Sequence, residues 1–167
     1  YAPSRHNFTA PLPLDSDAVD LIIWRHAEAE DGVPDLERRL TTKGRKQAER
    51  VSQWLLQRLP ARFAVIASPA ARAQQTAEAL GVPVKTDRSL APGATPASIV
   101  KACGWPDYKG AAVVVGHQPD LGRALAELLG ARGGLSIKKG GLWWISNRVR
   151  DEKDQVVVRS VVSPDLL

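Results

Sequence analysis

The sequence contains little cysteine, no methionine and no long apolar run. Cys103 is the only cysteine among 167 residues, so no disulfide can form within the chain. This usage is typical of a reducing compartment, and we expect a cytoplasmic protein. No apolar run approaches the roughly 20 residues that a membrane-spanning helix needs. No basic-then-apolar signal pattern opens the sequence either, so we expect no membrane partner.

Aromatic residues are also scarce, at 5%. No basic run alternates with Phe or Tyr, as a stacking platform for single-stranded nucleic acid requires, so we expect no nucleic-acid partner. Lys and Arg number 23 against 18 Asp and Glu, which gives a formal net charge of +5. This balance favours anionic partners such as phosphates or acidic protein surfaces. An ordinary solvated basic surface explains the charge equally well.

The length of the chain fits one domain. Residues 1–18 carry few apolar groups in any period, and we interpret them as a flexible leader or a remnant of trimming, in keeping with the missing initiator Met. Residues 19–167 then form the domain. A domain of this size buries roughly 70% of the surface that its unfolded chain exposes, so it can fold without disulfides or a structural metal.

Short apolar runs alternate with amphipathic segments along this domain. The apolar runs predict strands at 19–24, 63–67, 82–85, 111–115, 142–147 and 156–162, the last two joined by a charged turn at 150–154. The amphipathic segments predict helices at 41–59, 70–80, 96–103 and 120–129, with Thr or Pro at two starts and Gly after two ends. This alternation predicts an α/β fold, a three-layer α/β/α sandwich around a mostly parallel six-stranded sheet.

Unusual polar residues follow three of the predicted strands. Arg25 and His26 end the first, Arg72 comes shortly after the second, and His117 follows the fourth. Ligands of open α/β sheets bind beyond the carboxyl ends of the strands. We therefore expect these four side chains to converge on one edge of the sheet.

Two guanidinium groups and two imidazoles suit phosphoryl transfer. Arginine forks match phosphate oxygens and stabilise charge in the transition state. A neutral imidazole can attack phosphorus, and a second, protonated one can donate to the phosphate. Taken singly, Arg25-His26 could be incidental, His117 could cap a turn and Arg72 could lie on a surface. Their joint placement favours chemistry, whereas His6 falls in the leader and is expected to be inert.

Arg25-His26-Ala27 resembles the Arg-His-Gly signature of the histidine phosphatase superfamily, the phosphoglycerate mutase-like proteins. The block from Ser68 to Ala77 resembles the second arginine motif of that family, and Gly116-His117 its second histidine site. Three further features are similar to the short SixA-type branch of phosphohistidine phosphatases: Leu40 to Gly44, His117-Gln118-Pro119 and Ser163-Pro164. The resemblance covers about residues 20–167, and four motifs in the right order make it specific.

The resemblance implies a role for each matching residue. His26 would be the nucleophile that becomes phosphorylated, Arg25 and Arg72 would clamp the phosphate, and His117 would donate a hydrogen bond to it. Substrate binding would extend to Arg38 and Gln118. The family's reaction implies no metal and no other cofactor.

The sequence departs from the family pattern at the general acid. Ser89 stands where larger members carry Glu, and the other carboxylates near the motifs are Glu28, Asp31, Asp35 and Asp87. An alkoxide leaving group needs a positioned acid, whereas the imidazole that leaves phosphohistidine is readily protonated. Weak provision of an acid therefore favours phosphohistidine substrates over phosphate esters. Ala27 in place of Gly is expected to be tolerated.

Residues 86–110 leave little room for a lid, which favours an open groove over a deep metabolite pocket. We expect a monomer that acts on phosphate or on a phosphorylated protein, such as a signalling domain of a phosphorelay. The alternatives are a small-molecule phosphomonoesterase on the same fold, a non-catalytic phosphate-binding module, and a basic nucleic-acid adaptor.

Overall fold

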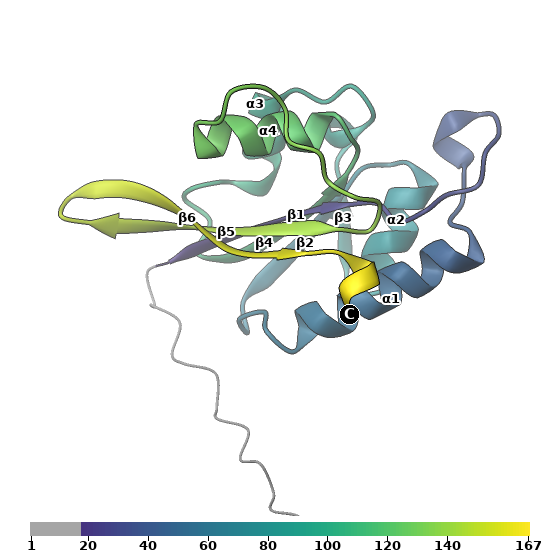
Figure 1. Ribbon diagram of the computed structural model, residues 1–167, viewed down its shortest axis with the longest axis horizontal. Helices are drawn as coiled ribbons and strands as arrows, with labels where there is room; N and C mark the ends of the chain where they lie inside the picture. The colour runs from purple at the N-terminus through teal and green to yellow at the C-terminus, as the bar shows by residue number, and fades with distance from the viewer. Residues whose placement is uncertain (1–17) are drawn as a thin grey trace, which may run out of the picture.

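The computed structural model describes residues 18–167 (Figure 1). The predicted flexible leader, apart from Ala18, lies outside the described residues, as does His6. Six strands form one sheet in the order β3-β2-β4-β1-β5-β6. Their bounds are β1 Val19–Arg25, β2 Phe63–Ala67, β3 Val84–Thr86, β4 Gly110–Gly116, β5 Leu142–Arg150 and β6 Lys153–Val162.

Four strands of the sheet run parallel. β4 pairs in parallel with both β1 and β2, and β2 pairs in parallel with β3. β5 runs antiparallel to β1, and β6 antiparallel to β5. The predicted α/β class and mostly parallel sheet are confirmed.

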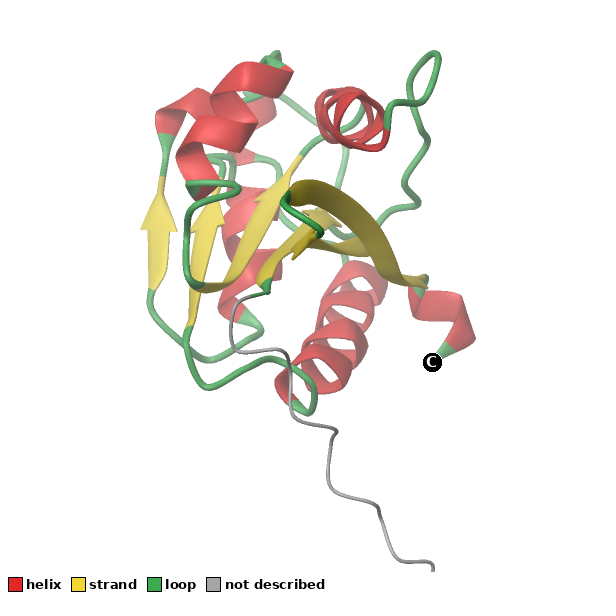
Figure 2. Cartoon of the chain, turned by 90° about the vertical axis from the view of Figure 1, so that its left-hand side faces the viewer, coloured by secondary structure: helices red, strands yellow, loops and turns green. Residues whose placement is uncertain are grey.

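Helices cover both faces of this sheet, which makes the predicted three layers (Figure 1 and Figure 2). Side chains alternate along a strand: Leu21 and Ile23 of β1 face one side, and Ile22 and Trp24 face the other. The first side packs against α3 (Pro96–Cys103) and α4 (Asp120–Leu129), and the second against α1 (Thr42–Leu56) and α2 (Ala71–Glu78). β1 is thus apolar on both faces because both faces are covered.

The helices begin where the sequence signals predict. The Thr41 hydroxyl accepts the N–H of Gly44 and caps α1. Thr95 and Ser98 form a capping box at α3, with Pro96 in its first turn. α4 ends at Gly130, whose φ of +64° suits glycine. The prediction for α1 ran too far, since the helix ends at Leu56 and residues 57–59 form a turn.

The predicted charged turn at 150–154 was too long. β5 continues to Arg150 and β6 starts at Lys153, so only Asp151 and Glu152 turn the chain, both with positive φ. The hairpin projects from the body of the molecule (Figure 1). Its end is exposed on both faces, so these residues carry charge and lack the apolar alternation that signals a strand. No helix within residues 18–167 is long and apolar enough to span a membrane.

Candidate active site

Three neighbouring strands end at the same level and place the candidate residues. Arg25, the last residue of β1, pairs with Gly116, the last residue of β4. His26 and His117 are therefore the first residues after these two paired strand ends. The backbone N–H of His26 donates to the Gly116 carbonyl at 3.0 Å. The two imidazole rings lie with their centroids 5.2 Å apart and their planes tilted by 55°. The predicted convergence of the two histidines is thus a direct result of parallel register.

His26 is held in one tautomer. Its Nδ1 lies 2.7 Å from the Ala27 carbonyl oxygen. A carbonyl can only accept, so Nδ1 carries the proton and Nε2 keeps its lone pair. Burial first, and then the positive charges of Arg72, Arg25 and Arg38, lower the pKa of His26 to about 4 against the opposing effect of the Ala27 bond. The ring is therefore neutral at pH 7, as a nucleophile must be.

His117 is also buried and neutral. Burial, followed by repulsion from His26 when that ring is protonated and by the charge of Arg72, lowers its pKa to about 3. Its Nε2 lies 2.7 Å from the Ser68 hydroxyl. A neutral imidazole donates from one ring nitrogen only, so the predicted hydrogen bond from His117 to a phosphate depends on the tautomer of the ring. That role of His117 stays a prediction.

Arg72 lies in the first turn of α2 and is 5% exposed. One terminal nitrogen, Nη1, donates to the Asp35 backbone carbonyl at 2.7 Å, and Nη2 donates to the Asp35 carboxylate at 3.0 Å. Arg25 ends β1, and its Nη1 donates to the Ile137 carbonyl at 2.7 Å. Both guanidinium groups are thus fixed by partners far away in the sequence.

The site contains hydrogen-bonding nitrogens that the protein itself does not satisfy. Within residues 18–167, the buried side-chain nitrogens and oxygens without a partner are Arg25 Nε, Arg72 Nε, His117 Nδ1 and Trp144 Nε1. The first three belong to this cluster. Buried polar groups are almost always hydrogen-bonded, so a concentration of unsatisfied ones needs an explanation. Two of them are guanidinium N–H donors, which suit the oxygens of an anion.

Other residues of the second arginine motif hold α2 against the segment that contains the first motif, Arg25-His26-Ala27. The Thr76 hydroxyl accepts the Ala27 N–H at 3.0 Å and donates to the Arg72 carbonyl at 2.7 Å. Gln74 donates to the Ser68 carbonyl, and Gln75 accepts the Leu40 N–H. Sequence reasoning did not assign these roles, although the motif contains the residues.

Arg38 and Gln118 are placed differently from the four central residues. Arg38 donates to the Glu30 carbonyl and, at 3.0 Å, to the Asp35 carboxylate. The positive charge of Arg38 still acts on the site, because it contributes to the lowered pKa of His26. Gln118 donates to the Leu135 carbonyl and accepts the Gly122 N–H, so both ends of its amide bind backbone. Substrate binding by either residue stays a prediction.

Three of the carboxylates near the motifs have a lowered pKa. Hydrogen bonds from Arg38 and then Arg72 lower the pKa of Asp35. The Thr41 hydroxyl and then Lys43 lower the pKa of Glu28. Asp87 caps the short 3-10 helix η2 (Arg88–Leu90). The hydrogen bonds that it accepts from Ser89 lower its pKa. A carboxylate with a lowered pKa is a poor proton donor at neutral pH.

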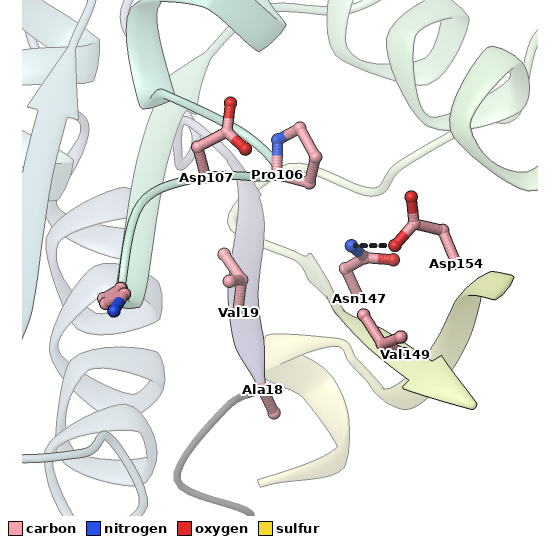
Figure 3. Close-up of a pocket in the computed structure, with 8 residues that line it drawn as sticks. Ala18, Val19, Pro106, Asp107, Asn147, Val149 and Asp154 are labelled. Carbon is pink, nitrogen blue, oxygen red and sulfur yellow. Dashed lines mark hydrogen bonds between the residues drawn. The ribbon is translucent and has the colours of Figure 1, made fainter. Parts of the chain in front are cut away.

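A hollow of about 330 Å³ lies at the end of β1 opposite to His26 (Figure 3). It is lined by Ala18, Val19, Pro106, Asp107, Lys109, Asn147, Val149 and Asp154. It contains no histidine, cysteine or arginine. In the described part of the chain, no group of three or more His, Cys, Asp or Glu residues is arranged to hold a metal ion. The strand-end cluster is therefore the candidate for phosphoryl chemistry.

Comparison with known proteins places this chain beside the histidine phosphatases. Residues 21–92 match the model of the histidine phosphatase superfamily, branch 1. An uncharacterized protein of Picosynechococcus sp. is 39% identical over 139 residues, which covers 74% of this chain and 82% of that relative.

Solved structures share the fold at low sequence identity. One is the protein histidine phosphatase SixA in complex with tungstate, at a TM-score of 0.71 and 24% identity, covering 88% of this chain and 98% of that one. A phosphoserine phosphatase from Entamoeba histolytica, in complex with phosphoserine, gives a TM-score of 0.66 at 18% identity, covering 89% and 99%.

Proposed function

Given that the chain belongs to the histidine phosphatase superfamily, we propose that it hydrolyses phosphohistidine in a protein substrate through a covalent phosphohistidine on His26. The observation that carries this proposal is the pairing of a neutral His26, with Nε2 free, with unsatisfied buried guanidinium donors on Arg25 and Arg72. A fold neighbour holds tungstate, an oxyanion of similar charge and shape to phosphate.

The reaction would take place in two displacements. The phosphoryl oxygens bind the Arg25 and Arg72 guanidinium groups and His117. The His26 Nε2 lone pair forms a bond to phosphorus, while the bond from phosphorus to the substrate's imidazole nitrogen breaks and that nitrogen takes up a proton. A water oxygen then attacks the phosphorus on His26, and the N–P bond breaks with its electron pair returning to Nε2. Phosphate leaves with the water oxygen, and a proton of that water passes to solvent.

The state of the carboxylates supports phosphohistidine over phosphate esters. Asp35 is the carboxylate in contact with the Arg72 fork, and its lowered pKa keeps it ionised at neutral pH. An alkoxide leaving group depends on a positioned acid, whereas a departing imidazole can take its proton from water. The site is therefore better suited to a substrate whose leaving group needs no acid.

The shape of the region supports a macromolecular substrate. Residues between β3 and β4 form η2 and α3, and their side chains Leu90 and Ile99 are buried against the sheet. This segment therefore belongs to the outer layer of the sandwich. Because the connection between β3 and β4 is short, we expect the strand ends to be open to a side chain carried on another protein.

Two measurements test the proposal. A histidine-phosphorylated peptide, phosphoserine and a sugar phosphate are compared by the release of inorganic phosphate. We expect kcat/KM for the peptide to exceed that for both esters; faster turnover of the esters would contradict the substrate assignment and favour a small-molecule phosphomonoesterase.

The covalent route has its own test. Rapid acid-free quenching with labelled substrate should trap a phosphoenzyme that is labile in acid and stable in base, and His26→Ala should abolish both the label and turnover. His6→Ala is the matched control and should keep both. Undiminished turnover by His26→Ala would rule out the covalent route, and phosphate binding without turnover in the unmodified protein would indicate a phosphate-reading module.

A further inference from the structure

Ser68 is fixed by four hydrogen bonds at the end of β2. Its backbone N–H donates to the Val115 carbonyl at 3.0 Å, and its carbonyl accepts from the Gln74 side chain at 2.7 Å. Its hydroxyl oxygen accepts the Ala70 N–H at 3.2 Å and lies 2.7 Å from His117 Nε2. The side chain is completely buried. It cannot reorient without breaking its hydrogen bonds to Ala70 and His117.

The direction of the bond between Ser68 and His117 follows from counting protons. The hydroxyl has one hydrogen, and the Ala70 N–H already occupies a lone pair of its oxygen. Among the described residues, His117 Nε2 is the acceptor within reach of that hydrogen. If Nε2 carried the proton, the buried hydroxyl hydrogen would have no partner, which is costly. The hydroxyl therefore donates to Nε2, and the ring proton lies on Nδ1.

We propose that Ser68 is a positioning residue that holds neutral His117 in the tautomer with its proton on Nδ1, so that this N–H donates to the phosphoryl group. The proposal rests on the proposed function, because it assigns the direction of a hydrogen bond in that same site. His117 Nδ1 is one of the buried nitrogens without a partner in the described structure. The opposite tautomer would present a lone pair to an anion and repel it.

The tautomer matters because His117 is neutral. A protonated imidazole has an N–H on both nitrogens, whereas a neutral one donates from only one. The low pKa of His117, about 3, keeps the ring neutral before an anion arrives. Its capacity to donate thus depends on its partner at Nε2. The two histidines are alike in this respect. The Ala27 backbone carbonyl sets the tautomer of His26, and the Ser68 hydroxyl sets the tautomer of His117.

The first test reads the tautomer directly and needs no turnover. Long-range ¹H–¹⁵N spectra of the ¹⁵N-histidine-labelled protein at pH 7 separate protonated from unprotonated ring nitrogens, and His117→Gln assigns the signals. We expect a protonated Nδ1 and an unprotonated Nε2 in His117. A protonated Nε2 would overturn the proposal, whatever the protein's activity.

The second test uses variants of the serine. Ser68→Ala should lose the single tautomer, raise the Kd for inorganic phosphate in calorimetric titration, and lower kcat/KM about 10- to 100-fold, by analogy with the loss of a partner that orients a metal-binding histidine. Ser68→Thr keeps the hydroxyl and should restore the tautomer and most of the affinity. Ser52→Ala removes another buried serine, whose hydroxyl donates to the Glu49 carbonyl on α1, and should change neither.

The outcomes separate the two proposals. An unchanged His117 tautomer and phosphate affinity in a folded Ser68→Ala protein would refute the role of Ser68. Changes in tautomer and affinity in that variant, combined with no phosphatase activity in the unmodified protein, would uphold the role of Ser68 and refute the proposed function alone.

Discussion

Asp35 accepts two hydrogen bonds from Arg72, one with its backbone carbonyl at 2.7 Å and one with its carboxylate at 3.0 Å. The same carboxylate accepts from Arg38 at 3.0 Å, so it bridges two of the guanidinium groups that surround His26. Asp35 belongs to a short 3-10 helix, η1 (Asp35–Glu37), in the loop between β1 and α1. It orients Arg72 and also lowers the positive charge that a phosphate meets.

Asp35→Asn should separate these two effects. The backbone carbonyl still holds Arg72, but one negative charge is gone. A partly exposed ion pair contributes up to about 1 kcal/mol, so inorganic phosphate should bind about two- to fivefold more tightly. Turnover of a phosphohistidine peptide should stay within about threefold, since no acid is needed.

Calorimetry and a phosphate-release assay measure both quantities for Asp35→Asn. Asp31→Asn is the control, because Asp31 lies in the same loop, 3.9 Å from Arg38, with a fully exposed side chain. A loss of more than tenfold in turnover of the peptide would assign Asp35 a part in the chemistry.

Arg72→Ala should lower kcat by about 10²-fold or more, the usual effect of removing one donor to the transition state. The buried Nε and both terminal nitrogens of Arg72 are lost together, and Asp35 loses one of its two guanidinium partners. Steady-state kinetics measures the effect, with Arg50→Ala on the exposed side of α1 as a control for charge. A loss below about threefold would remove Arg72 from the site.

Stability should fall as the pH is lowered from 7 to 5. The pKa values of His26 and His117 are lowered to about 4 and about 3, below the ordinary value of 6.5. In this window the unfolded chain binds protons on both rings and the folded protein does not, so acid favours unfolding. Each histidine should reduce the free energy of unfolding by about 2 kcal/mol over these two pH units.

Urea unfolding at pH 7 and pH 5 measures this difference. His26→Gln removes one of the two titrating rings and should roughly halve the pH dependence that they cause. An identical dependence in the variant would show that His26 titrates normally in the folded protein.

Gly44→Ala should destabilise the fold although Gly44 lies in the first turn of a helix. A Cβ at this position would come 1.9 Å from the Glu28 carbonyl oxygen, in the segment that follows His26. The helical preference of Ala is worth about 1 kcal/mol at best, and overpacking costs typically about 1–3 kcal/mol or more. Because the obstacle is backbone, we expect a net loss of about 2 kcal/mol, measured by denaturant unfolding.

Gly134→Ala provides the contrast. A Cβ there would meet only the Arg123 side chain, at 3.9 Å, so stability should change by less than about 0.5 kcal/mol. Equal stability of the Gly44 and Gly134 variants would contradict the close approach of α1 to Glu28.

The positions of most elements and of the central residues could be predicted from local patterns. Continuous apolar runs signalled β1, β2 and β4 because helices cover both faces of these strands. The sequence did not give the end of β5 or the start of β6, because the exposed residues of these strands show no apolar alternation. Arg25, His26 and His117 were predictable as residues at one edge of the sheet because parallel strands have their carboxyl ends at the same edge, and the pairing of β1 with β4 makes them neighbours there.

The sequence by itself determined which chemical groups meet: two imidazoles and one guanidinium group at the ends of buried strands, and a second guanidinium group in the helix that follows one of them. Only the tertiary structure decided their states. The Ala27 carbonyl sets the proton on His26, the Ser68 hydroxyl lies against His117, and Asp35 reaches Arg72 across 37 positions. The physical reason is that periodicity and strand order are encoded locally, whereas a tautomer, a pKa or an ion pair depends on distances of a few ångströms between distant segments.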